Sequence, residues 1–329
     1  MNISYIKKEI EGNYLINIRS IKKVKNSYMI KTDDEDYGIK VIKYQFPHFY
    51  FIFSAISHLK KRGFNNIPEI ISTKDDLGYI KLGNCHAYLN KWINSRSCNY
   101  NDAHELKLAS QKLGELHKCS EAFTISSIMK PRIGWYSWIK VFETRSEEIL
   151  DFKRRIYQKA YRSDFDEIYL ANINDELEIA KKAIDELKSN NYIKFMDKEV
   201  LKRGFCHHDY ANHNVLINED GKLNIIDFDY CILDTHIHDV ASLLIRSMKD
   251  GKWSNNTASL ILNSYSKANS ISNDELKLIK GFIRFPQAFW QIGLQYYWEQ
   301  QPWREEILIN KISKYLKDRD NREKFIDNF

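Results

Sequence analysis

The chain of 329 residues is 43% hydrophobic and 29% charged, which is typical of a globular protein large enough for two lobes with separate cores. The N-terminus has charged residues where a secretion signal needs an apolar run. No stretch approaches the roughly 20 apolar residues of a membrane-spanning helix. We therefore expect a protein that is made and kept in the cytoplasm unless assembly delivers it elsewhere. The net charge of +6 arises from Lys and Arg residues scattered among acids, which favours a solvated surface over a nucleic-acid site.

Short runs rich in β-branched and aromatic residues predict strands in the first third of the chain, separated by turn-forming residues. The predicted strands are 16–21, 27–31, 37–42, 79–81 and 87–89. A helix is predicted over 49–62, where apolar residues recur at helical spacing before Gly63.

Helical patterns dominate the rest of the chain. Asp102 is a candidate helix cap because Glu105 follows three residues later, and an apolar stripe begins at Leu106. The same kind of stripe recurs over 175–188. We therefore predict an α+β, two-lobed fold, with a small β-rich nucleotide-binding lobe at 1–92 and a larger, mostly helical catalytic and acceptor lobe at 93–329. The connector is expected near 90–96.

The stretch RGFCHHDYANHNVLINEDGKLNIIDFDY, residues 203–230, carries the strongest functional signal. Apolar runs at 215–217 and 223–226 flank the turn-forming sequence NEDG, and this pattern predicts a β-hairpin. Asp209 and Asn214 precede the predicted hairpin, and Asp227 follows it.

Phosphoryl transfer uses these residue types in this order. Asp209 is suited to orienting and deprotonating an attacking hydroxyl, whereas Asn214 and Asp227 are suited to holding Mg²⁺ against nucleotide phosphates. The transfer depends mostly on positioning and charge neutralisation, so a few oxygen ligands at fixed separation carry much of it. The alternative interpretation is structural, with Asp227 and Asp229 capping a loop.

From His207 to Ala241 the sequence resembles the aminoglycoside phosphotransferases and choline kinases, which are relatives of the protein kinases. The resemblance implies an enzyme that uses ATP and Mg²⁺, with Asp209 as catalytic base and with Asn214 and Asp227 as metal ligands. It also implies that His207 belongs to the catalytic machinery as the residue that braces the loop. Asp239 corresponds to the acidic position that anchors the following helix.

Within this group the chain resembles the CotS-type spore coat proteins of endospore-forming bacteria. The resemblance rests on HHDYANHNVLI, IIDFDYCILDTHIHDVASLLIR, LGELHKCSEAF, WIKVFETR, FPQAFWQ and YYWEQQPWREE, which together extend over nearly the whole chain. It implies a role in assembly of the spore coat, with other coat proteins as partners.

A lysine that grips the nucleotide phosphates is expected on the third strand of a kinase-like sheet. In the run YGIKV, Lys40 faces the site if Ile39 and Val41 face the other way. Lys43 is the second candidate. The alternative is an exposed strand lysine without a functional role.

Two departures from the kinase pattern affect the nucleotide site. The turn between the first strands, residues 21–27, contains no glycine, and without glycine a close approach of its backbone to phosphate is difficult. The predicted helix over 49–62 contains no acid to pair with Lys40, and Glu69 lies beyond it. We therefore expect Lys40 either to be misoriented or to be held by a carboxylate from elsewhere.

Aromatic residues gather late in the chain, where choline kinase-like proteins bind their acceptor. Aromatic rings can stabilise a cation, but rings at helical spacing more often pack in a core, and we favour packing. The residues are Trp290, Tyr296, Tyr297, Trp298 and Trp303. His236 and His238 beside Asp239 form a weak metal pattern, for which capping or core roles are the preferred interpretation.

The sequence supports a leading hypothesis and two alternatives. The first is ATP- and Mg²⁺-dependent phosphorylation of a hydroxyl on a small molecule or a coat component. The second is a coat scaffold with a kinase fold and little or no catalysis, and the third is a regulator that binds ATP without turning it over. Asp209, Asn214 and Asp227 favour the enzyme, whereas the missing glycines and helix acid favour the scaffold.

Overall fold

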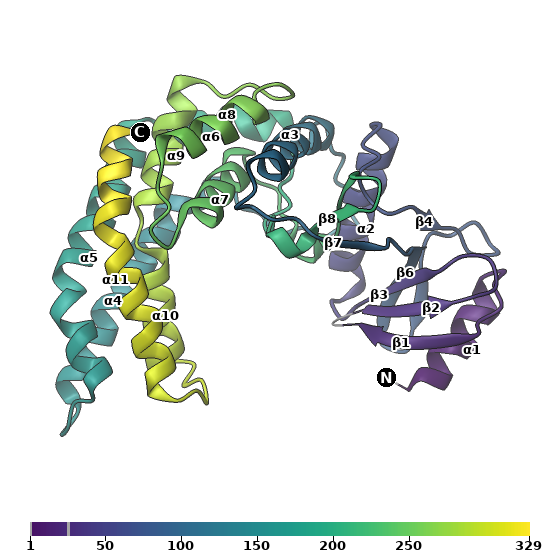
Figure 1. Ribbon diagram of the computed structural model, residues 1–329, viewed down its shortest axis with the longest axis horizontal. Coiled ribbons are helices and arrows are strands. Elements are labelled where there is room, and N and C mark those ends of the chain that lie inside the picture. Colours follow the sequence, from purple (N-terminus) through teal and green to yellow (C-terminus); the bar gives the residue numbers. More distant parts are fainter. Residues whose placement is uncertain (1, 25–26) are drawn as a thin grey trace.

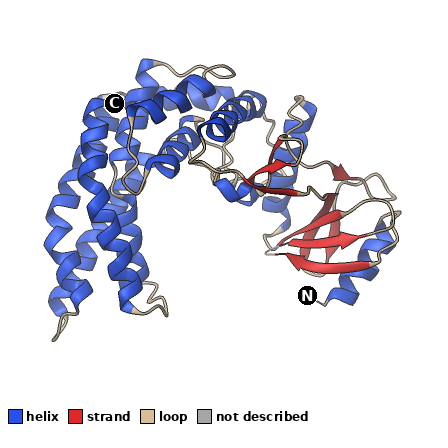
Figure 2. Cartoon of the chain, in the orientation of Figure 1, coloured by secondary structure: helices blue, strands red, loops and turns tan. Residues whose placement is uncertain are grey.

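The computed structural model describes residues 2–24 and 27–329. A β-rich N-lobe, which holds the N-terminus, lies at one end of the molecule, and a mostly helical C-lobe forms the other (Figures 1 and 2). The predicted lobe boundary at 92/93 falls between the last strand of the N-lobe sheet and the first strand of the C-lobe, and it stays a prediction.

The N-lobe is built on an antiparallel sheet with the strand order β1-β2-β3-β6-β4, and β5 also pairs with β6. The strands are β1 (Ser20–Val24), β2 (Ser27–Lys31), β3 (Tyr37–Ile42), β4 (Ile70–Ile71), β5 (Ile80–Leu82) and β6 (Cys85–Lys91). In central strand β3, Ile39 is buried in the core that the sheet shares with the first helix. Lys40 points to the opposite face because successive side chains alternate along a strand, as predicted.

The first helix, α1 (Ile3–Asn13), was not predicted, and the strand predicted at 16–21 lies instead at β1, Ser20–Val24. Ile6 and Ile10 are fully buried, and they are four residues apart on one helix face. The Asn2 side chain accepts a hydrogen bond from the Ser4 N–H and caps the helix. Helical spacing of apolar residues therefore outweighs the β-preference of the individual isoleucines.

Helix α2 (Phe46–Lys61) begins earlier than the predicted helix, with Pro47 in its first turn, and ends before Gly63, whose φ of 87° favours glycine. Its buried face belongs to the large core that also contains the C-lobe helices. Helix α2 thereby holds the N-lobe against the C-lobe.

The C-lobe combines a small sheet with a large set of helices. The sheet has the order β7-β8-β9, formed by β7 (Ser95–Ser97), β8 (Val215–Asn218) and β9 (Leu223–Ile225), and β7 overlaps the end of the predicted connector. The helices are α3 (Ala103–Ser120), α4 (Ser137–Gln158), α5 (Asp164–Ser189), α6 (Tyr192–Lys202), α7 (Ile237–Met248), α8 (Asn255–Tyr265), α9 (Asn273–Arg284), α10 (Gln287–Tyr297) and α11 (Glu305–Asn328). Asp102 caps α3 by accepting the Glu105 N–H, as predicted.

The late aromatic residues pack, and their ring faces lie under cations of the chain itself. Tyr297 is buried in a core cluster against which Trp290 and Tyr296 pack, whereas Trp298 and Trp303 remain exposed. The cation–ring pairs are Arg145 over Trp290, Arg155 over Trp298, Lys311 over Trp303, and Lys159 over both Tyr296 and Tyr297. The preferred packing interpretation is therefore confirmed for Trp290, Tyr296 and Tyr297.

Across residues 2–24 and 27–329, the structure contains no helix that is both long enough and apolar enough to cross a membrane.

Candidate functional site

A β-hairpin brings Asn214 and Asp227 together. Strands β8 (Val215–Asn218) and β9 (Leu223–Ile225) pair in antiparallel register with Val215 opposite Ile225, which confirms the predicted hairpin. At its open end, the Ile226 N–H donates a hydrogen bond of 3.0 Å to the Asn214 carbonyl. Asn214, immediately before β8, is therefore a backbone neighbour of the segment that carries Asp227.

Asp209 is joined to Asn214 and to a cation. The Asn214 Nδ2 donates to Asp209 Oδ2 at 2.9 Å and to the Asp209 carbonyl at 3.0 Å. Arg246 Nη2 donates to the other carboxylate oxygen, Oδ1, at 2.8 Å. The Asp209 carboxylate is thus held in one orientation from both sides.

His207 links the segment before the hairpin to the segment after it. Its Nε2–H donates to the Ile226 carbonyl at 2.9 Å, and its Nδ1 accepts from the Asp209 N–H at 3.3 Å. The ring is fully buried, and burial lowers the pKa of His207 despite nearby carboxylates, which favours the neutral ring that these bonds require. His207 is in position to brace the loop that carries Asp209.

Asp239, in the first turn of α7, anchors the backbone of this loop. Its buried carboxylate accepts from the His207 N–H at 2.7 Å, the His208 N–H at 2.9 Å and His117 Nε2 at 3.1 Å. Burial alone raises the pKa of Asp239, but the hydrogen bond and charge of His117 outweigh it and hold the pKa well below its usual range. Asp239 therefore fixes the turn that presents Asp209.

Lys40 reaches the hairpin from the opposite lobe. Its Nζ lies 2.9 Å from Asp227 Oδ1 and 2.9 Å from Asp229 Oδ2. Burial lowers the pKa of Lys40, but the two carboxylates outweigh this effect and raise it, so Lys40 carries its charge. Lys40 was expected either to be misoriented or to be held by a carboxylate from elsewhere. The structure shows the latter, because Asp227 and Asp229, which lie outside α2, hold it.

The carboxylates around Lys40 have oxygen atoms suited to a divalent cation. Asn214 uses its amide nitrogen on Asp209, which leaves its Oδ1 as an acceptor. Asp229 Oδ1 is buried and, among the described residues, has no hydrogen-bond partner. Burial raises the pKa of Asp229. The charge of Lys40 lowers this pKa and the charge of Asp227 raises it, and the net effect is a raised pKa. A hard cation bound by these oxygens would relieve the crowding of carboxylates, so the residues fit Mg²⁺.

From the sequence, Asp229 received only a possible loop-capping role and Arg246 was not named, although both belong to this arrangement. Asp229 lies two residues after Asp227 in the sequence DFD, and that spacing was the available signal. Arg246 lies seven residues after Asp239, which places both on one face of α7. Asp227 itself has a φ of 67°, a conformation that Asp tolerates better than most residues.

The nucleotide-clamping part of the site is less complete. Helix α2 contains no acid, and Lys43, the second candidate lysine, lies exposed beyond the end of β3. The glycine-free turn over 21–27 includes Lys25 and Asn26, which lie outside the described residues.

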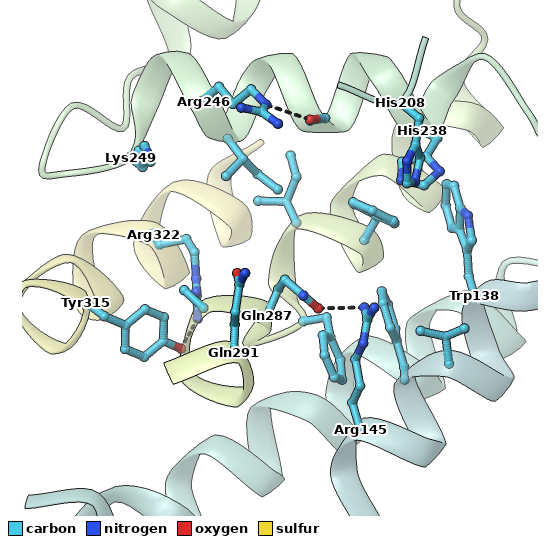
Figure 3. Close-up of a pocket in the computed structure, with 18 of the residues that line it drawn as sticks. Trp138, Arg145, His208, His238, Arg246, Lys249, Gln287, Gln291, Tyr315 and Arg322 are labelled. Carbon is cyan, nitrogen blue, oxygen red and sulfur yellow. Dashed lines mark hydrogen bonds between the residues drawn. The ribbon is translucent and has the colours of Figure 1, made fainter. Parts of the chain in front are cut away.

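A cavity of about 960 Å³, called the central cavity below, opens beside Asp209 between α4, α7, α9, α10 and α11 (Figure 3). This volume is at the upper end of small-molecule sites, which measure roughly 300 to 1,000 Å³. The cavity reaches the loop that carries Asp209 through His208, the neighbour of Asp209, and through Arg246, which contacts the Asp209 carboxylate. Asp209 itself does not line the cavity, but these two residues connect its wall to the Asp209 side chain and backbone.

His236 and His238 occupy ion-paired positions, in agreement with the preferred core interpretation. His238 Nδ1 lies 2.7 Å from Asp234 Oδ2. His236 lies between two buried glutamates, at 3.1 Å from Glu199 and 3.2 Å from Glu275. These carboxylates raise the pKa of His236 although burial alone lowers it.

The Glu199–His236 pair predicts a pH optimum for its contribution to stability. Burial raises the pKa of Glu199, but the bond to His236 outweighs it and lowers the pKa from 4.5 to about 2, so its stabilisation is lost as pH falls below 4.5. The pKa of His236 is raised above 6.5, so its stabilisation is complete below pH 6.5 and is lost as pH rises through the folded-state value. The pair should stabilise most between pH 4.5 and 6.5.

Urea unfolding of the wild type and of His236→Gln at acidic, intermediate and alkaline pH tests this prediction. The difference in unfolding free energy between the two proteins should be greatest in the intermediate range. A difference that does not vary with pH contradicts the assignment of a charged His236.

Comparison with known proteins extends these observations. A family model described as "Spore coat putative kinase YutH" matches residues 7–329. Spore coat protein S of Bacillus subtilis (strain 168) is 20% identical over 312 residues, which cover 94% of this chain and 88% of that protein.

Solved structures share the fold. An aminoglycoside phosphotransferase from Alicyclobacillus acidocaldarius matches with a TM-score of 0.86 at 17% identity, covering 98% of this chain and 94% of that one. Spectinomycin phosphotransferase, in complex with ADP and spectinomycin, matches with a TM-score of 0.67 at 16% identity, covering 96% and 94%. Choline kinase LicA from Streptococcus pneumoniae matches with a TM-score of 0.54 at 15% identity, covering 99% of each chain. The predicted α+β, two-lobed fold of the aminoglycoside phosphotransferase type is confirmed.

Proposed function

Since the chain belongs to the YutH family of kinase-like spore coat proteins, as its CotS-type resemblance predicted, we propose that it transfers the γ-phosphoryl group of ATP to a hydroxyl. The acceptor is a small molecule or a component of the spore coat. The N-lobe, residues 1–92, binds the nucleotide, and the C-lobe, residues 93–329, supplies the catalytic residues and the acceptor site.

Asp209 accepts the proton of the acceptor hydroxyl in this proposal. The hydroxyl oxygen forms a bond to the γ-phosphorus, and the bond between the γ-phosphorus and the β,γ-bridging oxygen breaks, so that ADP leaves with the bonding electrons. Asn214 and Asp227 would hold Mg²⁺, which neutralises charge on the phosphates. Lys40 binds phosphate oxygens, and His207 and Asp239 keep the loop of Asp209 in place.

The observation that carries this proposal is the joint placement of Asp209 and Asn214. One amide group of Asn214 holds Asp209 Oδ2 at 2.9 Å while its oxygen stays free for a cation. If Asn214 only stabilised a loop, it would not need to orient the partly exposed carboxylate of Asp209. The bond from Ile226 to Asn214 adds Asp227 to the same region.

The alternative function is a coat scaffold with little or no catalysis, and a specific observation favours it. Both candidate carboxylates are already neutralised by cations of the chain, Asp209 by Arg246 and Asp227 by Lys40. Together with the lack of an acid in α2, this arrangement is stable without nucleotide. Other coat proteins are the partners in this alternative.

Turnover of ATP in the presence of hydroxyl compounds separates the candidates. The purified protein is incubated with Mg²⁺ and γ-labelled ATP, and a panel of amino alcohols, sugars, hydroxy acids and a spore coat extract serves as acceptors. Transfer of label to any hydroxyl supports the enzyme. Binding of ATP without transfer to any member of the panel leaves a nucleotide-binding regulator, and absence of binding leaves the scaffold.

A further inference from the structure

The charged residues of the central cavity are mostly cations. The cationic residues that line it are Arg145, Arg246, Lys249, Lys311, Lys314 and Arg322, and the carboxylates are Asp234, Asp250 and Asp318. Figure 3 shows several of these cations on helices that surround the same space. The charge that the cavity presents to a ligand depends on which of these residues already have partners within the chain.

Each carboxylate that lines the cavity already has an ion-pair or hydrogen-bond partner within the chain. Asp234 Oδ2 is 2.7 Å from His238 Nδ1, and although burial lowers the pKa of His238, the hydrogen bond and charge of Asp234 outweigh burial and raise it. Asp250 is 3.1 Å from Lys314 Nζ. Asp318 accepts from Trp253 Nε1 at 2.9 Å and from a backbone N–H. These acids are not available to a cationic ligand without loss of an internal bond.

Several cations lack such a partner. Within residues 2–24 and 27–329, Arg145, Lys249 and Lys311 have no carboxylate within 4.0 Å. Arg145 donates instead to the neutral Gln287 side chain at 2.6 Å. Buried Arg322 does have a carboxylate partner, since its Nη2 lies 3.5 Å from Glu323, but its Nε has no hydrogen-bond partner among the described residues, although buried donors are nearly always paired.

The polar face of α10 adds neutral donors to these cations. Gln287, Gln291 and Gln295 follow at intervals of four residues on one helix face, and all line the cavity. The carbonyl oxygens of Gln287 and Gln295 accept from Arg145 and Lys311, respectively. Their amide NH₂ groups are therefore left as donors, which an anion can use.

We propose that the central cavity binds an acceptor that carries a carboxylate or phosphate group besides the hydroxyl that is phosphorylated, and that Arg145 recognises this anion. The inference rests on the proposed function, and it specifies the acceptor.

Arg246 connects the anion site to the chemistry. It lines the cavity and contacts Asp209 Oδ1 at 2.8 Å, so an acceptor bound at Arg145 extends past Arg246 to bring its hydroxyl to Asp209. The proton of that hydroxyl passes to Asp209, and the phosphoryl group passes to its oxygen, as in the proposed reaction.

Calorimetric titration without nucleotide tests the anion site separately from catalysis. The probes are gluconate, which supplies a carboxylate, and glycerol 3-phosphate, which supplies a phosphate; glucosamine and choline are the cationic controls, all at equal ionic strength. The wild type should bind at least one anion, and the cations at least about tenfold more weakly. Because a hydrogen bond to a charged group is lost, Arg145→Gln should weaken anion binding about 10- to 100-fold, whereas Arg145→Lys should recover part of it.

Arg154→Gln is the matched control, since Arg154 lies on the same helix at 72% exposure and outside the cavity, and it should bind anions like the wild type. Absence of anion binding to the wild type, tighter binding of the cations, or unchanged affinity in Arg145→Gln each overturns the inference. If Arg145→Gln does not fold, Lys249→Gln takes its place with the same two outcomes. If the protein binds the anions but transfers no phosphoryl group, the proposed function is contradicted while the anion site is supported.

Discussion

Asp209→Asn is expected to slow phosphoryl transfer by about 10²- to 10⁴-fold, the range that general base catalysis contributes, while affinity for Mg²⁺-nucleotide stays within about twofold of the wild type. Asparagine has nearly the same shape as aspartate and retains an oxygen that can accept from Asn214, as Asp209 does at 2.9 Å. It cannot take a proton from the acceptor hydroxyl. Steady-state transfer of labelled phosphate and nucleotide titration measure the two effects independently.

Asp220→Asn is the control for this experiment. Asp220 lies in the exposed turn of the same hairpin, where it accepts from Asn218 at 3.3 Å, so the same chemical change there should leave transfer unaffected. A transfer rate in Asp209→Asn equal to that of the wild type would remove Asp209 as the base.

Lys40→Met is expected to lower the free energy of unfolding by on the order of 3 kcal/mol in the absence of Mg²⁺. Methionine fills much of the same volume but leaves Asp227 and Asp229 without the cation that lies 2.9 Å from each. Mg²⁺ added alone should recover more stability in the variant than in the wild type, because it replaces a missing charge. Chemical denaturation with and without Mg²⁺ measures both quantities.

Lys43→Met provides the comparison, since Lys43 is exposed just beyond the same strand. It should change stability little and should not alter the response to Mg²⁺. Equal responses to Mg²⁺ in Lys40→Met and the wild type would contradict a cation site at Asp227 and Asp229.

The proximity of Asp209, Asn214 and Asp227, the residues proposed for catalysis and metal binding, was predictable because they are close in sequence. Asn214 and Asp227 flank one hairpin whose apolar runs and NEDG turn specify its register, and Asp209 shortly precedes Asn214, so their proximity follows from short-range rules. The orientation of Lys40 was predictable for a similar reason, from the alternation of side chains along β3.

The partners of these residues were not predictable in the same way. Lys40 and Asp227 are 187 positions apart, and Arg246 meets Asp209 only because α7 packs against the catalytic loop. Such contacts depend on tertiary packing, which local propensity does not encode. Helix α1 was missed for a different reason, since isoleucine favours strands when it is considered residue by residue, although Ile6 and Ile10 share one helix face.

Without nucleotide, the carboxylates of the site are already paired with cations of the chain. Arg246 and Lys40 are paired with Asp209 and Asp227, and in the proposed reaction both cations would share or release these carboxylates when Mg²⁺-nucleotide and acceptor bind. The lack of a helix acid is consistent with this arrangement, because Lys40 already has two carboxylates to hold it in place.

Titration of a non-hydrolysable ATP analogue into the wild type and into Asp227→Ala, with and without Mg²⁺, tests whether Asp227 holds Mg²⁺ beside a bound nucleotide. The wild type should bind the nucleotide more tightly with Mg²⁺, and Asp227→Ala should lose at least about tenfold of that Mg²⁺-dependent affinity. Equal affinity in both proteins, or binding by the wild type that Mg²⁺ does not change, would contradict this role of Asp227.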